Sequence, residues 1–157
     1  MRSGACGREL LVVPAAETGH SRDIVVTQRD ITQVQLAKAA IFGGIETLLQ
    51  LAGISYGAVQ RVDVAGAFGS YLDLRSAIAI GMLPRFSNAE YLQVGNAAGA
   101  GAQMALVSSS QRERAREIAK KAERVELKQH AVFDRSMALA TRLPSAGVAS
   151  HGRAGRM

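Results

Sequence analysis

DIVVTQRDITQVQLAKAAIFGGIETLLQLAG, residues 23–53, is the stretch that decides the fold. It opens on a short β-branched run, residues 23–26, which predicts a strand. From residue 28 to residue 52 apolar side chains recur at helical spacing, and Thr27 and Asp30 suit the first turn of a helix. We therefore predict a strand that leads directly into a long helix.

Short apolar runs alternate with amphipathic stretches over the rest of the chain. Further strands are predicted at residues 10–13, 61–67, 91–94 and 124–127. Further helices are predicted at residues 74–80, 96–107, 110–122 and 131–143. Strands that alternate with helices indicate the α/β class, with helices layered on a largely buried sheet.

Charge divides the chain unevenly. The 157 residues carry a formal net charge of +6, all of it in residues 112–157. Opposite charges are interleaved over residues 111–126, which is typical of a solvated helix face and ranks nucleic-acid binding last among the possible functions. We expect a flexible N-terminus at residues 1–6, one ordered lobe at residues 7–143 and a disordered basic tail at residues 144–157.

Several classes of site are disfavoured by residue counts. A single cysteine, Cys6, excludes an internal disulfide and a cysteine-ligated iron–sulfur or zinc site within the chain. The three histidines lie far apart in the sequence, so no metal site is predicted. Residues 91–111 lack charge but hold glutamines, an asparagine and serines, which is too polar for a membrane span. We expect a cytoplasmic protein without a signal peptide.

Two junctions of strand and loop are candidates for ligand binding: VDVAGAFG at residues 62–69 and YLQVGNAAGAGA at residues 91–102. Glycine at the carboxyl end of a strand lets backbone N–H groups approach a phosphate or a ribose. The candidate nucleotide contacts are Gly66, Ala67, Phe68, Gly69, Gly95 and Asn96. Neither junction has the G-x-G-x-x-G spacing, and a simple glycine turn or close helix packing is the alternative at each.

Lys38 is the other candidate. It lies within QLAKAAIFGG, residues 35–44, where a lone cation needs a route to water or an anionic partner. Extension to solvent is one interpretation, and contact with a nucleotide is the other. No base lies at a suggestive spacing from Cys6 or from a serine, so we predict no catalytic residue.

Three strings together resemble a known family. They are DIVVTQRDITQVQLAKAAIFGGIETLL (residues 23–49), VDVAGAFGSYLDLRSAIAIGMLP (residues 62–84) and YLQVGNAAGAGAQMAL (residues 91–106). They closely resemble the C-terminal part of the reductive activators of corrinoid proteins, over about residues 7–143. The resemblance implies an ATP-dependent metallo-reductase whose ferredoxin-like N-terminal domain carries a two-iron, two-sulfur cluster. Its C-terminal domain, similar to the acetate and sugar kinase, heat-shock chaperone and actin superfamily, couples ATP hydrolysis to reduction of cob(II)amide to cob(I)amide on a partner.

The resemblance also implies a fold and a site. The fold is an actin/ribonuclease-H-like lobe, a mixed sheet flanked by helices. The adenosine motif of the superfamily matches residues 64–69, and Gln35 and Lys38 have the spacing of two residues that flank the adenine. The implied cofactor is ATP with Mg. Methyltransferase activation by way of a corrinoid protein is the implied pathway.

Two parts of the family pattern do not match this sequence. The cluster-binding cysteines are missing, so we expect no iron–sulfur cluster here, and the phosphate-binding hairpins would precede Gly7. We therefore expect a fragment or subunit, the adenosine-side lobe of an activator, inactive without its ferredoxin-like domain and first lobe. The alternative is a non-catalytic module that docks on a corrinoid protein or a partner lobe, and a homodimer is left open.

Overall fold

The computed structural model describes residues 2–4 and 7–144; residues 145–157, where a disordered tail is expected, lie outside the described residues. The strands are β1 (Arg2–Gly4), β2 (Gly7–Val13), β3 (Ile24–Thr27), β4 (Arg61–Ala65) and β5 (Glu90–Gly95). The helices are α1 (Gln28–Leu51), α2 (Ala67–Tyr71), α3 (Leu74–Ala79), α4 (Ala97–Val107), α5 (Ser109–Lys121) and α6 (Ala131–Ala140). Short 3₁₀ helices lie at Ala15–Glu17, Tyr56–Ala58 and Leu127–Gln129. The predicted α/β class is confirmed.

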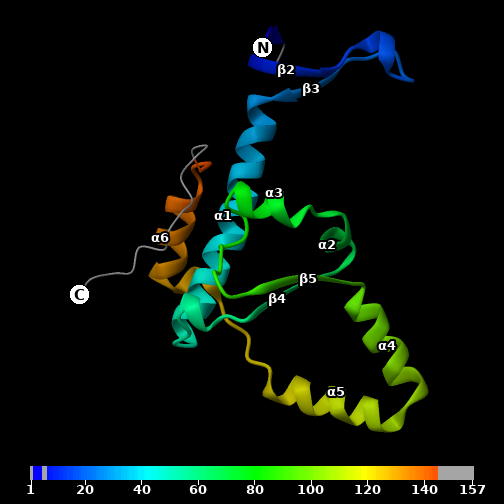
Figure 1. Cartoon of the computed structure of the whole chain (residues 1–157), viewed down its shortest axis with the longest axis vertical. Coiled ribbons are helices and arrows are strands. Elements are labelled where there is room, and N and C mark those ends of the chain that lie inside the picture. Colours follow the sequence, from blue (N-terminus) through cyan, green and yellow to red (C-terminus); the bar gives the residue numbers. More distant parts are fainter. Residues whose placement is uncertain (1, 5–6, 145–157) are drawn as a thin grey trace.

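Helix α1 is the spine of the molecule (Figure 1). Its start is fixed by a capping box: the Asp30 N–H donates to Thr27 Oγ1 at 3.2 Å, and the Thr27 N–H donates to Asp30 Oδ2 at 2.8 Å. The strand that leads into a long helix, predicted from residues 23–53, is confirmed.

The strands form two sheets, one antiparallel and one parallel. The first has the order β1-β2-β3 with antiparallel pairing, and the second pairs β4 with β5 in parallel. Residues 2–4, within the segment expected to be flexible, form β1 and pair with β2. Because β4 and β5 run in parallel, their carboxyl ends meet at the same edge.

The expectation of a largely buried sheet is wrong. All strand residues whose burial the structure describes are half-buried or exposed. In β2, the Leu10 and Val12 side chains are 51% and 54% exposed. The antiparallel sheet projects beyond the N-terminal end of α1, so no helix covers it as a second layer (Figure 1).

Two predicted strands also differ from the structure. Residues 124–127 form no strand, because this exposed segment, where Arg124 pairs with Glu126, has no neighbouring strand to complete a ladder. The strand predicted at residues 61–67 ends at Ala65, because Gly66 has a φ of +94° and turns the chain into α2.

Helix α6 packs beside α1, and we call this contact the α1–α6 corner (Figure 1). Gly43 permits this approach: a Cβ there would lie 3.2 Å from the Met137 nitrogen and 3.3 Å from the Phe133 oxygen. A separate core forms where the buried residues Ala77, Met82 and Leu83 pack against β4, β5 and α1. No helix of the described chain is long and apolar enough to cross a bilayer.

Candidate functional site

The structure brings the two glycine junctions together at the carboxyl edge of the parallel pair. Ala65 pairs with Gly95, and the Gly66 N–H donates to the Gly95 carbonyl at 2.7 Å. Gly66 and Gly95 have φ values of +94° and +63°, in the left-handed region that side chains disfavour. We call this pair of junctions, with the helix starts that follow them, the glycine edge.

Helix α2 is held against the glycine edge by two features. Gln93 Nε2 donates to the Gly69 carbonyl at 2.6 Å and to the Leu72 carbonyl at 2.7 Å. A Cβ at Gly69 would lie 2.9 Å from Val64 Cγ1, so this glycine lets α2 pack on β4. Gly69 therefore has a packing reason for its identity, whereas Gly66 and Gly95 have a conformational one. Ala67 and Phe68 are the first residues of α2.

Asn96 caps the helix at the second junction. Its Oδ1 accepts a hydrogen bond from the Gly99 N–H at 3.0 Å at the start of α4. Six of the residues chosen from the sequence therefore lie on or beside one edge: Gly66, Ala67, Phe68, Gly69, Gly95 and Asn96.

The Lys38 side chain is buried and forms hydrogen bonds within the fold. It is 1% exposed, and its Nζ donates to the carbonyls of Ala140 and Arg142, the second at 2.8 Å. A cation is favourable at this place because the carbonyls at the C-terminus of α6 carry partial negative charge. Burial lowers the pKa of the Lys38 ammonium. In the structure Lys38 therefore neither extends to solvent nor pairs with an anionic side chain, because its partners are backbone carbonyls.

Gln35 and Lys38 are not brought to the glycine edge. Gln35 is half-buried on α1, and in the described chain no hydrogen bond joins it to either junction. The α1–α6 pair lies at one side of the molecule, whereas the carboxyl ends of β4 and β5 point to the opposite side (Figure 1).

Two hollows were not found by sequence reasoning. One, of about 550 Å³, is lined by Arg75, Ile78, Arg85, Phe86 and Ser87. The other, of about 400 Å³, lies between the end of α1 and the start of α6. The residues of the first lie within positions 75–87 and those of the second come from two distant segments, and neither set has the spacing of a known motif.

Acidic groups in the described chain do not form a metal centre. Those residues include no cluster of three or more His, Cys, Asp or Glu side chains placed to hold a metal ion. Asp63 on β4 accepts from Arg61 at 2.8 Å, and Asp73 accepts from the Ser76 N–H at 2.8 Å. The hydrogen bonds from Ser76 lower the pKa of Asp73.

Comparisons with known proteins agree with one another. Residues 1–152 match a family model described as the C-terminal domain of RACo, the ASKHA domain. The chain is 40% identical over 104 residues to the corrinoid activation enzyme RamQ of Eubacterium limosum, which is 66% of this chain and 18% of RamQ. A solved structure titled reductive activator for corrinoid, iron–sulfur protein matches with a TM-score of 0.80 and 38% identity, over 91% of this chain and 23% of that one. This chain therefore spans only about a fifth of the length of each relative.

Proposed function

The chain belongs to the family of RACo C-terminal domains of the ASKHA type, and from this premise we propose that it forms the adenosine-side lobe of an ATP-dependent reductive activator of corrinoid proteins. The family resemblance inferred from the three sequence strings is confirmed by the match over residues 1–152. The actin-like fold class is supported by the matching activator structure.

The observation that carries the proposal is the glycine edge. Two strand ends with left-handed glycines lie side by side, joined by the bond from the Gly66 N–H to the Gly95 carbonyl. Ligands of open α/β sheets bind outside the carboxyl ends of the parallel strands. Gly66 and Gly95 have no Cβ, and no atom beyond their chain neighbours lies within 4 Å of where one would stand. The backbone at these two positions is therefore open to a nucleoside.

We assign no magnesium ligand to the glycine edge. Mg²⁺ with a nucleotide is held by one or two carboxylates together with phosphate oxygens, and none of the candidate nucleotide contacts at this edge carries a carboxylate. We therefore assign the adenosine side of ATP to the glycine edge and no step of phosphate chemistry to this chain. Hydrolysis and electron transfer to the corrinoid are assigned to portions that the longer relatives possess.

A charge placed at the glycine edge tests the nucleotide proposal. Asp caps a helix as well as Asn does, so Asn96→Asp keeps the cap but puts a negative charge beside an incoming nucleotide. Ser108→Asp makes a charge change of similar size at the cap of α5 and is the matched control. We expect Mg-ATP to bind the wild-type chain in titration calorimetry, and Asn96→Asp to weaken binding about tenfold, which is about 1.4 kcal/mol.

Two results would count against nucleotide binding at this edge. One is the absence of any heat with the wild-type chain. The other is equal affinity for ATP in Asn96→Asp and Ser108→Asp. Gln35 and Lys38 are retained as proposed adenine contacts only if Gln35→Ala also weakens binding, since Lys38 has a structural partner in α6.

A second candidate function is docking without catalysis. Apolar side chains that a self-contained domain would bury are open to solvent, among them Leu106 and Val107 at 78% and 84% exposure. Size-exclusion chromatography of the chain mixed with a corrinoid protein, or with the N-terminal portion of a relative, would detect a complex. A monomer that elutes unchanged in both mixtures would contradict docking, and a dimer of the chain alone would identify a second copy as the partner.

A further inference from the structure

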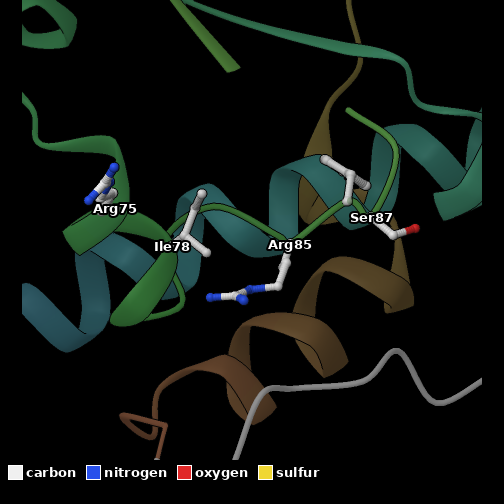
Figure 2. Close-up of a pocket in the computed structure, with 5 residues that line it drawn as sticks. Arg75, Ile78, Arg85 and Ser87 are labelled. Atoms are coloured by element: carbon white, nitrogen blue, oxygen red, sulfur yellow. The ribbon is translucent and has the colours of Figure 1, made fainter. Parts of the chain in front are cut away.

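A hollow beside α3 is lined by two arginines that the nucleotide proposal does not use. It has a volume of about 550 Å³, and none of its lining residues belongs to the glycine edge. Figure 2 shows Arg75 and Arg85 on separate segments, with Ile78 between them. Ile78 is half-buried and Phe86 is buried, so the floor of the hollow is apolar.

The two guanidinium groups are not neutralised within the described chain. In that part of the molecule neither Arg75 nor Arg85 forms an ion pair or a side-chain hydrogen bond. Asp73 precedes α3 and attracts Arg75, but its Oδ2 already accepts from the Ser76 N–H and from Ser76 Oγ, at 2.8 and 2.5 Å. Two positive charges are therefore available to a ligand.

The turn that carries Arg85 is held in place from both sides. Tyr91 Oη donates to the Pro84 carbonyl at 2.5 Å and accepts from the Phe86 N–H at 2.9 Å. The Phe86 ring also contacts the Tyr56 ring, with a centroid separation of 4.9 Å. Because this backbone is already fixed, binding orders the Arg85 side chain but costs no further backbone entropy.

We propose that this hollow, the arginine hollow, binds an acidic segment of a protein partner. Two carboxylates of the segment pair with Arg75 and Arg85, and an apolar side chain between them packs on Ile78 and Phe86. Arginine with an aromatic residue is the composition that protein interfaces favour, and guanidinium pairs carboxylate through two parallel hydrogen bonds.

Protein carboxylates suit this geometry better than a single phosphate does. The guanidinium groups lie apart with Ile78 between them, rather than converging on one point (Figure 2). A phosphate contacts one compact cluster of donors. In an extended segment every second side chain lies on the same face, so an acidic, an apolar and an acidic residue at positions i, i+2 and i+4 match the order of charge, apolar floor and charge. Ser87 at the rim adds a hydroxyl that can donate to a backbone carbonyl of the segment.

A labelled peptide provides the test on the full chain. The probe is a fluorescein-labelled decapeptide in which glutamate and leucine take turns at every second position, with serine between them, so that both residue types share one face of the extended peptide. Binding is followed by fluorescence anisotropy. Arg75→Gln combined with Arg85→Gln removes both charges, and Arg114→Gln combined with Lys120→Gln removes two charges from the exposed face of α5 as a matched control. We expect the hollow variant to bind at least about tenfold more weakly and the control to change about twofold or less.

Separate outcomes overturn the proposal. Equal weakening by the two double variants would show that net charge alone attracts the peptide. Unchanged affinity of the hollow variant would exclude the hollow. Displacement of the peptide by millimolar inorganic phosphate at constant ionic strength, from the wild type and the control alike, would assign a phosphate site instead. Both arginines are exposed, so thermal unfolding of the hollow variant should match the wild type, and loss of binding without loss of folding supports the proposal.

Discussion

The α1–α6 corner and the glycine edge use their special residues in opposite ways. At the corner, Lys38 and Gly43 are buried and each contacts the backbone of α6. At the edge, Gly66 and Gly95 have left-handed backbone and nothing within 4 Å of where a Cβ would stand. Sequence patterns indicated the same role for Lys38 and for these glycines, contact with a nucleotide. The difference teaches that a residue whose contacts are all internal is explained by the fold, whereas one that leaves open space is free for a ligand.

The largest expected effect is at Lys38. Lys38→Met keeps the length of the side chain and removes the donor, leaving the partly buried carbonyls of Ala140 and Arg142 without it. We expect a loss of about 3 kcal/mol in the free energy of unfolding, measured by urea titration. Lys120→Met on exposed α5 is the control and should change stability little. A Lys38→Met protein as stable as the wild type would show that the hydrogen bonds of Lys38 do not stabilise the fold.

The close approach of α1 and α6 is tested by two neighbouring glycines. A Cβ at Gly43 would stand 3.2–3.4 Å from backbone atoms of α6, whereas one at Gly44 meets only Leu127 Cδ1, at 3.4 Å. We expect Gly43→Ala to lower the free energy of unfolding by about 2 kcal/mol through overpacking. Gly44→Ala should raise it by up to about 1 kcal/mol, because alanine favours a helix interior. If thermal or urea unfolding shows that both variants change the free energy of unfolding in the same direction, α6 is not held by this contact.

At the glycine edge the expected cost is conformational and smaller. Gly66→Ala forces a side chain into positive φ and should lower the free energy of unfolding by about 1 kcal/mol, without a packing clash. Gly57→Ala, in the 3₁₀ helix Tyr56–Ala58 without positive φ and with open space, is the control. If the two variants unfold alike, Gly66 does not need its backbone freedom. Titration of the folded Gly66→Ala protein with Mg-ATP then tests whether nucleotide binding at the edge also requires this backbone freedom.

The smallest effect concerns acid pH at Asp73, beside the arginine hollow. Hydrogen bonds from Ser76 lower the pKa of Asp73 below 3.8, so its contribution to stability is complete above pH 3.8 and is lost as pH falls through the folded-state pKa. Asp73→Asn keeps the cap of α3 and cannot titrate. Melting temperatures of the two proteins should therefore converge or cross as the pH falls below 3.8. Parallel pH curves would mean that Asp73 has the same pKa in the folded and unfolded chain.

Sequence patterns predicted local structure well where the signal is itself local. The capping box of Thr27 and Asp30, the span of α1 and the glycine at the end of β5 all involve residues a few positions apart. The strand at residues 124–127 was predicted wrongly because a strand also needs a neighbour, and pairing is not visible in a short window. The buried sheet was wrong for the same reason, since burial of β2 requires a second layer.

The sequence by itself determined the α/β class, the long helix α1 and the family, because helical spacing, glycine turns and three long strings are properties of the chain as written. Only the tertiary structure decided what the candidate residues do. It placed Gly66 against Gly95, turned Lys38 onto carbonyls more than a hundred residues away, and set Arg75 and Arg85 around one hollow. The physical reason is that a hydrogen bond or an exposed charge depends on atoms that folding brings together, and spacing along the chain does not encode that distance.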